Sequence, residues 1–167
     1  LKKTNPSPFA GLAVFKDRAI ISSSPERLVS VKNGYLETRP IAGTRKRGGT
    51  GIYDVALSKD LLDNQKERAE HIMLVDLERN DLSKVTVKGT VKVNESMIVE
   101  SYTHVHHIVS NVRGKIKRGI SPGKIIKAVF PGGTITGCPK IRCMEILSEI
   151  EQAGRGPYTG SMGYINN

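Results

Sequence analysis

The sequence predicts an α+β domain in which antiparallel hairpins and amphipathic helices share one core. The runs LVSVK and YLETR flank Asn33 and Gly34, and Asn-Gly is a strong hairpin signal because both positions tolerate the positive φ of a type I′ turn. Residues 66–82, KERAEHIMLVDLERNDL, have the spacing of a helix. A chain of 167 residues, of which 38% are hydrophobic, is the size of one ordinary domain and can bury a core.

Further strands are expected on both sides of this hairpin. FAGLAVF (9–15) and AIIS (19–22) predict a first hairpin, and VTVKGTVKV (85–93) predicts another that turns at its lysine and glycine. The stretch YTHVHHIVSNVR (102–113) is rich in β-branched residues, which favours a strand buried on both faces.

Helices are expected at 54–63, leading into the central helix, and near 122–129. Another helix follows FPGGTITGC, and Pro139 suits its first position. The final segment, RGPYTGSMGYINN, predicts a loop and the first residues of a strand. No internal repeat, linker or domain boundary is evident.

The central helix presents Glu67 and Glu70 three positions apart, which places them side by side on one face. Mg²⁺ takes oxygen ligands from one or two carboxylates and keeps waters for a substrate. Glu70 is the better candidate because it points between Met73 and Leu74, out of an apolar surface. Spaced glutamates are also usual on a solvated helix face, so the pair alone does not establish a metal site.

The same projection places Asp76 and Asn80 one turn apart within an apolar stripe that includes Ile72 and Met73. Buried polar groups must find partners, so we expect this face of the helix to carry a polar network inward. His71 is expected to point away from the face that carries Glu70.

Two segments near the first hairpins carry polar groups. In SSSPERL (22–28), Pro25 fixes the backbone before Glu26 at a strand start. Glu26 can act as an acid catalyst only if the fold places it suitably relative to other acids. RPIAGTRKRGGTG (39–51) is a glycine-bearing basic loop whose N–H groups and Thr44 hydroxyl can hold a carboxylate, although it can equally be a surface loop.

Two later segments are further candidates. His107 shares a strand side with Val105 and Val109, where a histidine is more often a hydrogen-bonded core residue than a catalyst. The glycine-rich stretch FPGGTITG runs into a helix, whose free N–H groups and positive dipole end attract anions. Cys138 stands where a nucleotide P-loop has lysine, so this is not a nucleotide P-loop and the expected ligand is a carboxylate.

Composition excludes several classes of protein. The formal net charge of +10 suggests nucleic-acid binding, but aromatic residues are only 5% of the chain, Trp is absent and no base-stacking pattern occurs. No apolar run is long enough for a membrane span, and the first residues lack the hydrophobic region of a signal peptide. We therefore expect a cytoplasmic protein with no nucleic-acid and no membrane partner.

Together the motifs resemble a known family in order and spacing: SPERL, RPIAGT, ERAEHIMLVDLERNDL, HIVS, FPGGTITGCPKIRCMEI and GPYTGSMGY. These are similar to the chorismate-utilising enzymes, which include component I of anthranilate synthase and of aminodeoxychorismate synthase. The resemblance implies a layered α+β fold, an antiparallel β-sandwich flanked by helices, with a Mg²⁺-dependent chorismate site. It also implies that residues 1–167 are part of one chorismate-binding catalytic domain, truncated at both ends.

The resemblance assigns roles by position. Glu70 is the expected Mg²⁺ ligand, with Glu67 in or near the second layer around the metal. Glu26 and His107 are the catalytic candidates, and Glu26 is the acid that helps to expel the C4 hydroxyl of chorismate. The positions expected to line the substrate are Gly43, Thr44, His107, Thr134 and Tyr158.

Two features point to different members of the family. Ala42 stands where aminodeoxychorismate synthases often carry an attacking lysine, whereas FPGGTITG resembles the aminodeoxychorismate type. We expect chorismate amination of that type, in the para-aminobenzoate and folate pathway. Anthranilate synthase, in tryptophan biosynthesis, is the alternative, and a non-catalytic binding fragment is an alternative of another class. Ammonia is expected from a glutamine amidotransferase subunit.

Overall fold

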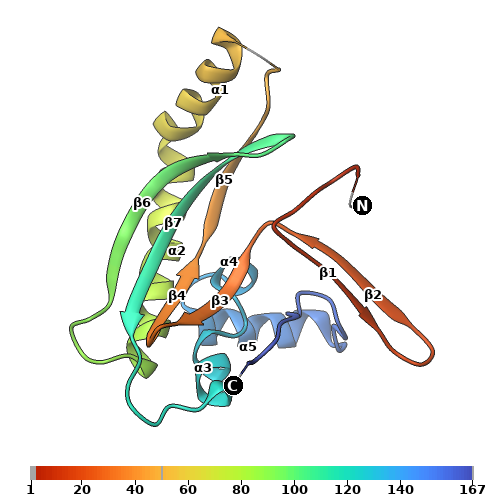
Figure 1. Cartoon of the computed structure of the whole chain (residues 1–167), viewed down its shortest axis with the longest axis vertical. Helices are drawn as coiled ribbons and strands as arrows, with labels where there is room; N and C mark the ends of the chain where they lie inside the picture. Colours follow the sequence, from red (N-terminus) through yellow and green to blue (C-terminus); the bar gives the residue numbers. More distant parts are fainter. Residues whose placement is uncertain (1–2, 50, 167) are drawn as a thin grey trace.

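The computed structural model describes residues 3–49 and 51–166 (Figure 1). Strands and helices follow one another in an α+β order. The elements are β1 (Phe9–Val14), β2 (Ala19–Ser24), β3 (Arg27–Lys32), β4 (Tyr35–Arg39), β5 (Ile41–Lys46), α1 (Ile52–Asp63), α2 (Gln65–Val85), β6 (Lys92–Ser101), β7 (Val105–Lys115), α3 (Pro122–Val129), α4 (Gly133–Thr136) and α5 (Lys140–Glu151).

The strands form two antiparallel sheets. β1 and β2 make a two-stranded hairpin that projects away from the main sheet (Figure 1). The main sheet has the order β3-β4-β7-β5, and β6 pairs with the other edge of β7. Helices flank this sheet, so the predicted α+β class with antiparallel sheets is confirmed.

β7 is the centre of the main sheet. Its first half pairs with β5, its second half pairs with β4, and β6 pairs along its other edge. Residues 106–112 of β7 are all buried. The prediction of a strand buried on both faces is therefore confirmed, and β7 lies between β6 on one edge and β4 and β5 on the other, with α2 packed against it.

The hairpin between β3 and β4 turns as the sequence predicts. Asn33 has φ 53° and Gly34 has φ 76°, the positive values that a type I′ turn requires. The register then places Lys32 opposite Tyr35.

α2 packs across one face of the main sheet, and α3 packs beside it. The fully or mostly buried apolar residues at this junction come from β4, β7, α2 and α3. They are Leu36, Leu82, Val85, Val112, Ile125, Ala128 and Val129. This core fixes the position of α2 relative to β5, which is the relationship that builds the site.

The predicted inward face of α2 is wrong. Ile72 is 52% exposed and Met73 is 40% exposed, and Asp76 and Asn80 also face outward. The buried residues are instead His71, Leu74, Leu77, Glu78, Asp81, Leu82 and Val85. Apolar residues occur all round this helix, so periodicity did not identify the buried face. Polar residues are tolerated on the buried face because partners on the sheet and on other helices satisfy them.

Three loop and strand predictions also differ from the structure. α2 continues to Val85, so the predicted 85–93 hairpin does not form, and the strand after it is β6, which pairs with β7. Part of the predicted 39–51 loop is strand β5. No strand forms among the described residues 152–166, where the C-terminal strand was expected. Within the described ranges, no helix has both the length and the apolar character needed to cross a bilayer.

Candidate functional site

β5 carries the first part of the candidate site. Its register with β7 shifts between Ile41 and Thr44, so Ala42 and Gly43 form a bulge. Gly43 has φ 96°, and an added Cβ would lie 3.1 Å from Ile108, 3.2 Å from Leu61 and 3.3 Å from Glu67 Oε2. Only glycine fits this conformation and this close approach. The bulge therefore brings the β5 backbone beside the carboxylate of Glu67 on α2.

Thr44 and His107, two of the positions expected to line the substrate, lie together. They are paired in register, and Thr44 Oγ1 lies 2.8 Å from His107 Nδ1. Burial lowers the pKa of His107, against the opposing effects of the Gly43 backbone and the charge of Glu100. The Tyr102 ring meets the His107 ring edge-on at 5.6 Å. A neutral imidazole next to a solvent-exposed hydroxyl can donate to or accept from a polar ligand.

Glu26 and Thr134 form the second group. The Thr134 hydroxyl lies 3.4 Å and 3.5 Å from the two carboxyl oxygens of Glu26. Burial raises the pKa of Glu26 to about 7, and the charge of Glu78 adds to this, whereas hydrogen bonds from Ile41 and Thr134 oppose it. Glu26 therefore keeps a proton on a substantial fraction of molecules near neutral pH.

The contact with Ile41 links the two groups. Glu26 meets the backbone of β5 at Ile41, three residues before Thr44. Both groups therefore border the same strand, the acid at Ile41 and the hydroxyl–imidazole pair at Thr44.

The two carboxylates on α2 have different surroundings. Glu67 Oε1 accepts a hydrogen bond from Arg45 at 3.0 Å, and the Asn64 side chain caps the helix by accepting from the Glu67 N–H at 3.1 Å. Glu70 is half exposed, and its nearest cation, Lys66, is 3.8 Å away. Because Arg45 already neutralises Glu67, Glu70 is the freer ligand for a hard cation. Carboxylate oxygens are the ligands that Mg²⁺ takes in ones or twos while it retains waters and accepts further oxygens from a substrate. Among the described residues no group of three or more potential metal-ligating side chains is present.

Tyr158 is not brought to these residues. Tyr158 is 70% exposed, and the Arg155 guanidinium carbon lies over its ring, 5.8 Å from the ring centroid. Its predicted role as a substrate-lining residue stays a prediction.

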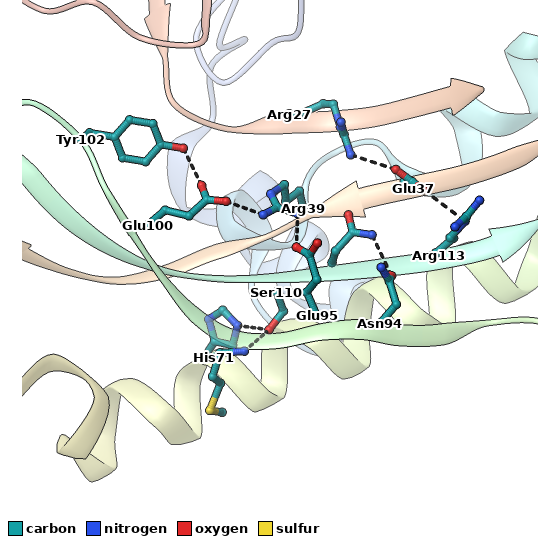
Figure 2. A network of polar contacts seen from close by, with 12 residues as sticks. Arg27, Glu37, Arg39, His71, Asn94, Glu95, Glu100, Tyr102, Ser110 and Arg113 are labelled. Carbon is teal, nitrogen blue, oxygen red and sulfur yellow. Dashed lines mark hydrogen bonds and ion pairs between the residues drawn. The ribbon is translucent and has the colours of Figure 1, made fainter. Parts of the chain in front are cut away.

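Beside His107, which lies opposite Glu100 in the register of β6 and β7, is a polar network that sequence reasoning missed (Figure 2). Arg39 Nη1 donates to Glu95 at 2.5 Å, and its other Nη donates to Glu100. The Tyr102 hydroxyl donates to Glu100 at 2.6 Å, and burial together with this carboxylate raises the pKa of Tyr102 to about 12. Burial alone would raise the pKa of Glu100, but the bonds from Tyr102 and Arg39 outweigh it and lower that pKa.

Two cavities lie on this side of the sheet. One of about 370 Å³ is lined by Phe9, Arg39 and Glu100 among others, and includes none of the predicted site residues. A second of about 230 Å³ lies against the N-terminal segment and is lined in part by Tyr102 and His107. His107 is thus the predicted residue that reaches a described cavity.

Two further buried clusters were also missed. His106 Nε2 lies 3.0 Å from Asp54, which also pairs with Arg47 at 2.7 Å. Lys140 Nζ pairs with buried Asp81 at 2.5 Å. Both clusters join residues more than 50 positions apart in the sequence, so no local sequence pattern predicts them.

The fold is that of a family of chorismate binding enzymes. The chain belongs to this family, whose model matches residues 1–167.

Individual relatives carry more specific names. The chain is 58% identical over 165 residues to the aminodeoxychorismate synthase component 1 of Bacillus subtilis (strain 168), covering 99% of the chain and 35% of the relative. It is 51% identical over 166 residues to the anthranilate synthase component 1 of Aquifex aeolicus (strain VF5), covering 99% and 34%. The crystal structure of anthranilate synthase component I from Streptococcus pneumoniae TIGR4 matches with a TM-score of 0.87 and 43% identity, covering 98% of the chain and 35% of that structure. The chain therefore spans about a third of the length of these relatives.

Proposed function

We propose that this chain forms part of the site of a Mg²⁺-dependent enzyme that aminates chorismate. Family membership supports chorismate as the substrate, and the most similar relatives reported above are synthases named for amination of this molecule or its product. The observation that carries the reaction type is Glu26, a half-buried carboxyl with a pKa near 7 that faces a hydroxyl from the glycine-rich loop.

Glu26 supplies the proton in the proposed step. A small nucleophile adds to C2 of the chorismate ring, the two conjugated double bonds shift, and the C4–O bond breaks with its electron pair on oxygen. The Glu26 proton passes to that oxygen, so the hydroxyl leaves as water. The added nucleophile then loses a proton to solvent. If that nucleophile is ammonia, the amine stays at C2, as anthranilate formation requires. For the aminodeoxychorismate outcome water adds at C2 first, and ammonia then enters at C4 while the double bonds shift back and the C2 hydroxyl leaves with a proton as water. General acids work best when their pKa is close to the operating pH, which is the property that burial gives Glu26.

The other residues hold the substrate. Chorismate carries two carboxylates, and the Thr44 hydroxyl together with the Gly43 backbone supplies neutral donors for one of them, while Thr134 lies beside the acid Glu26. The side chains that would hold Mg²⁺ are Glu70, with Glu67 beside it. The bound ion would orient the other carboxylate and neutralise its charge.

The relatives favour the aminodeoxychorismate outcome, in which the amine remains on a ring that keeps its enolpyruvyl group. The Bacillus relative with that name is more similar than the reported anthranilate synthases. Ala42 argues against covalent lysine catalysis at this position. Anthranilate formation is the second candidate, since relatives with that name are 51% identical. In both cases we propose a glutamine amidotransferase subunit as the ammonia source.

The test is Glu26→Gln in the complete gene product, with chorismate, ammonium and Mg²⁺ supplied. Glutamine keeps the size and the hydrogen bonds but cannot give up a proton, so kcat should fall by about 10² to 10⁴ while the KM for chorismate changes little. Glu145→Gln is the matched control, because Glu145 is an exposed partner of Arg142 on α5. A kcat for Glu26→Gln within a few-fold of wild type would remove Glu26 as the acid.

A further inference from the structure

His71 is fully buried between α2 and the main sheet, and its ring lies between two strands. Nε2 is 2.6 Å from Ser110 Oγ on β7, and Nδ1 is 3.2 Å from the Ala42 carbonyl oxygen on β5. Ser110 Oγ also accepts the backbone N–H of Met97 on β6 at 2.9 Å. Figure 2 shows His71 and Ser110 at the crossing of these elements.

The direction of each hydrogen bond follows from the groups involved. A carbonyl oxygen only accepts, so Nδ1 carries the proton that bonds to Ala42. In a neutral ring Nε2 then accepts, and the Ser110 hydroxyl donates to it while accepting from the Met97 N–H. The chain of bonds therefore runs in one direction, from Met97 through Ser110 and His71 to Ala42.

Both ends of this chain are β-bulges on opposite edges of β7. On β5 the register shifts between Ile41 and Thr44, and on β6 it shifts between Glu95 and Ile98, where Met97 has φ 50°. A bulge disrupts the ladder and leaves backbone groups in need of partners. His71 and Ser110 supply these partners to both bulges.

We propose that His71 is a positioning residue that holds the Ala42–Gly43–Thr44 bulge in the shape needed to bind substrate. Fixing the Ala42 carbonyl toward α2 fixes the plane of the Ala42–Gly43 peptide, so the Gly43 N–H points away from His71. It also fixes the backbone that leads into Thr44, whose hydroxyl contacts His107. This role rests on the proposed function, since Gly43 and Thr44 are substrate residues only if chorismate binds there.

Three variants of the complete gene product test the proposal. His71→Leu removes both bonds, whereas His71→Asn keeps an N–H close to the place of Nδ1. Thr86→Val is the matched control. Thr86 is buried at the other end of α2, where its hydroxyl donates to the Leu82 carbonyl at 2.8 Å. Loss of this bond lowers stability without touching the bulge.

At a temperature well below unfolding, we expect His71→Leu to change the KM for chorismate more than it changes kcat. If only about a tenth of His71→Leu molecules keep the bulge, the apparent KM for chorismate rises about tenfold while kcat changes less. His71→Asn should recover most of that loss, and Thr86→Val should show the wild-type KM despite a lower Tm. A wild-type KM for His71→Leu, or equal impairment of the Asn and Leu variants, would overturn the proposal.

Hydrogen–deuterium exchange separates this inference from the proposed function. Peptides covering 41–45 and 95–99 should exchange about tenfold faster in His71→Leu than in wild type and remain unchanged in Thr86→Val. If wild type shows no reaction with chorismate but this exchange pattern holds, the proposed function fails and His71 still holds the bulges. Unchanged exchange in His71→Leu would overturn the positioning role whatever the activity.

Discussion

At the scale of the residue, Glu26 shows a conflict between activity and stability. Its folded pKa is about 7, and the ordinary value is 4.5. Between these pH values the folded protein holds a proton that the unfolded chain has released, so stability falls as pH rises from 4.5 to 7. The protein with Glu26 is therefore expected to be less stable at neutral pH than a variant with an uncharged side chain at this position.

Thermal unfolding at two pH values checks this prediction. Glu26→Gln should change Tm little at pH 4, where both side chains are neutral, and should raise Tm at pH 8. Burial also raises the pKa of Glu78, but Glu78 is present in both proteins, so its effect on Tm largely cancels when wild type and Glu26→Gln are compared. The same Tm difference at both pH values would contradict the raised pKa.

Glu70 gives a second residue-scale prediction. Glu70→Gln should raise the Mg²⁺ concentration needed for half-maximal activity by about tenfold or more, because a charged oxygen ligand is lost. Asp76→Asn on the same helix is the control, since Asp76 is exposed and pairs with Arg79 at 2.9 Å. A titration of activity against Mg²⁺ measures both, and equal behaviour of the two variants would exclude Glu70 from the metal site.

At the scale of the element, α2 is joined to the glycine-rich loop by one buried cation. Lys140, whose side chain is 10% exposed, donates to Asp81 at 2.5 Å, to the Pro131 carbonyl at 2.6 Å and to the Val129 carbonyl at 3.0 Å. It therefore fixes the start of α5, the segment at Pro131 that leads into α4 with Thr134, and the end of α3 against α2.

Replacing this cation should be costly. Lys140→Met leaves the buried Asp81 carboxylate with Lys84 alone, at 2.7 Å, and removes the donor to the Pro131 and Val129 carbonyls, so we predict a loss of about 3 kcal/mol in the free energy of unfolding. Arg142→Met, two positions further on the same helix, breaks an exposed pair with Glu145 and should cost less than about 1 kcal/mol. Denaturant unfolding compares the two, and similar losses would show that Lys140 does not join these elements.

The same elements show what local sequence can predict. The Asn33–Gly34 turn and the buried strand β7 were predictable because turn chemistry and β-branched composition act locally. The buried face of α2 was not predictable, because His71 and Glu78 are buried only through partners supplied by distant segments. β6 was missed for a similar reason, since its bulges and its pairing with β7 interrupt the alternation that marks a strand.

At the scale of the whole molecule, β5 brings together groups from four parts of the chain. Glu26 precedes β3 and meets β5 at Ile41, Glu67 on α2 lies beside Gly43, His107 on β7 pairs with Thr44, and Thr134 in α4 contacts Glu26. The identities of these residues were predictable only from the combined motifs, because each motif alone has a common structural explanation. Their mutual placement required the fold, whose architecture matches a solved relative with a TM-score of 0.87.

The central claim is that the protein aminates chorismate, and product analysis of the complete gene product tests it most directly. Chorismate, Mg²⁺ and isotopically labelled ammonium are supplied, and the products are separated and identified by mass spectrometry. We predict a Mg²⁺-dependent product that carries the label and keeps the enolpyruvyl group, with pyruvate released only after a separate lyase is added. Prompt release of pyruvate with labelled anthranilate would assign the second candidate function. Absence of the label from every product of chorismate would contradict the account.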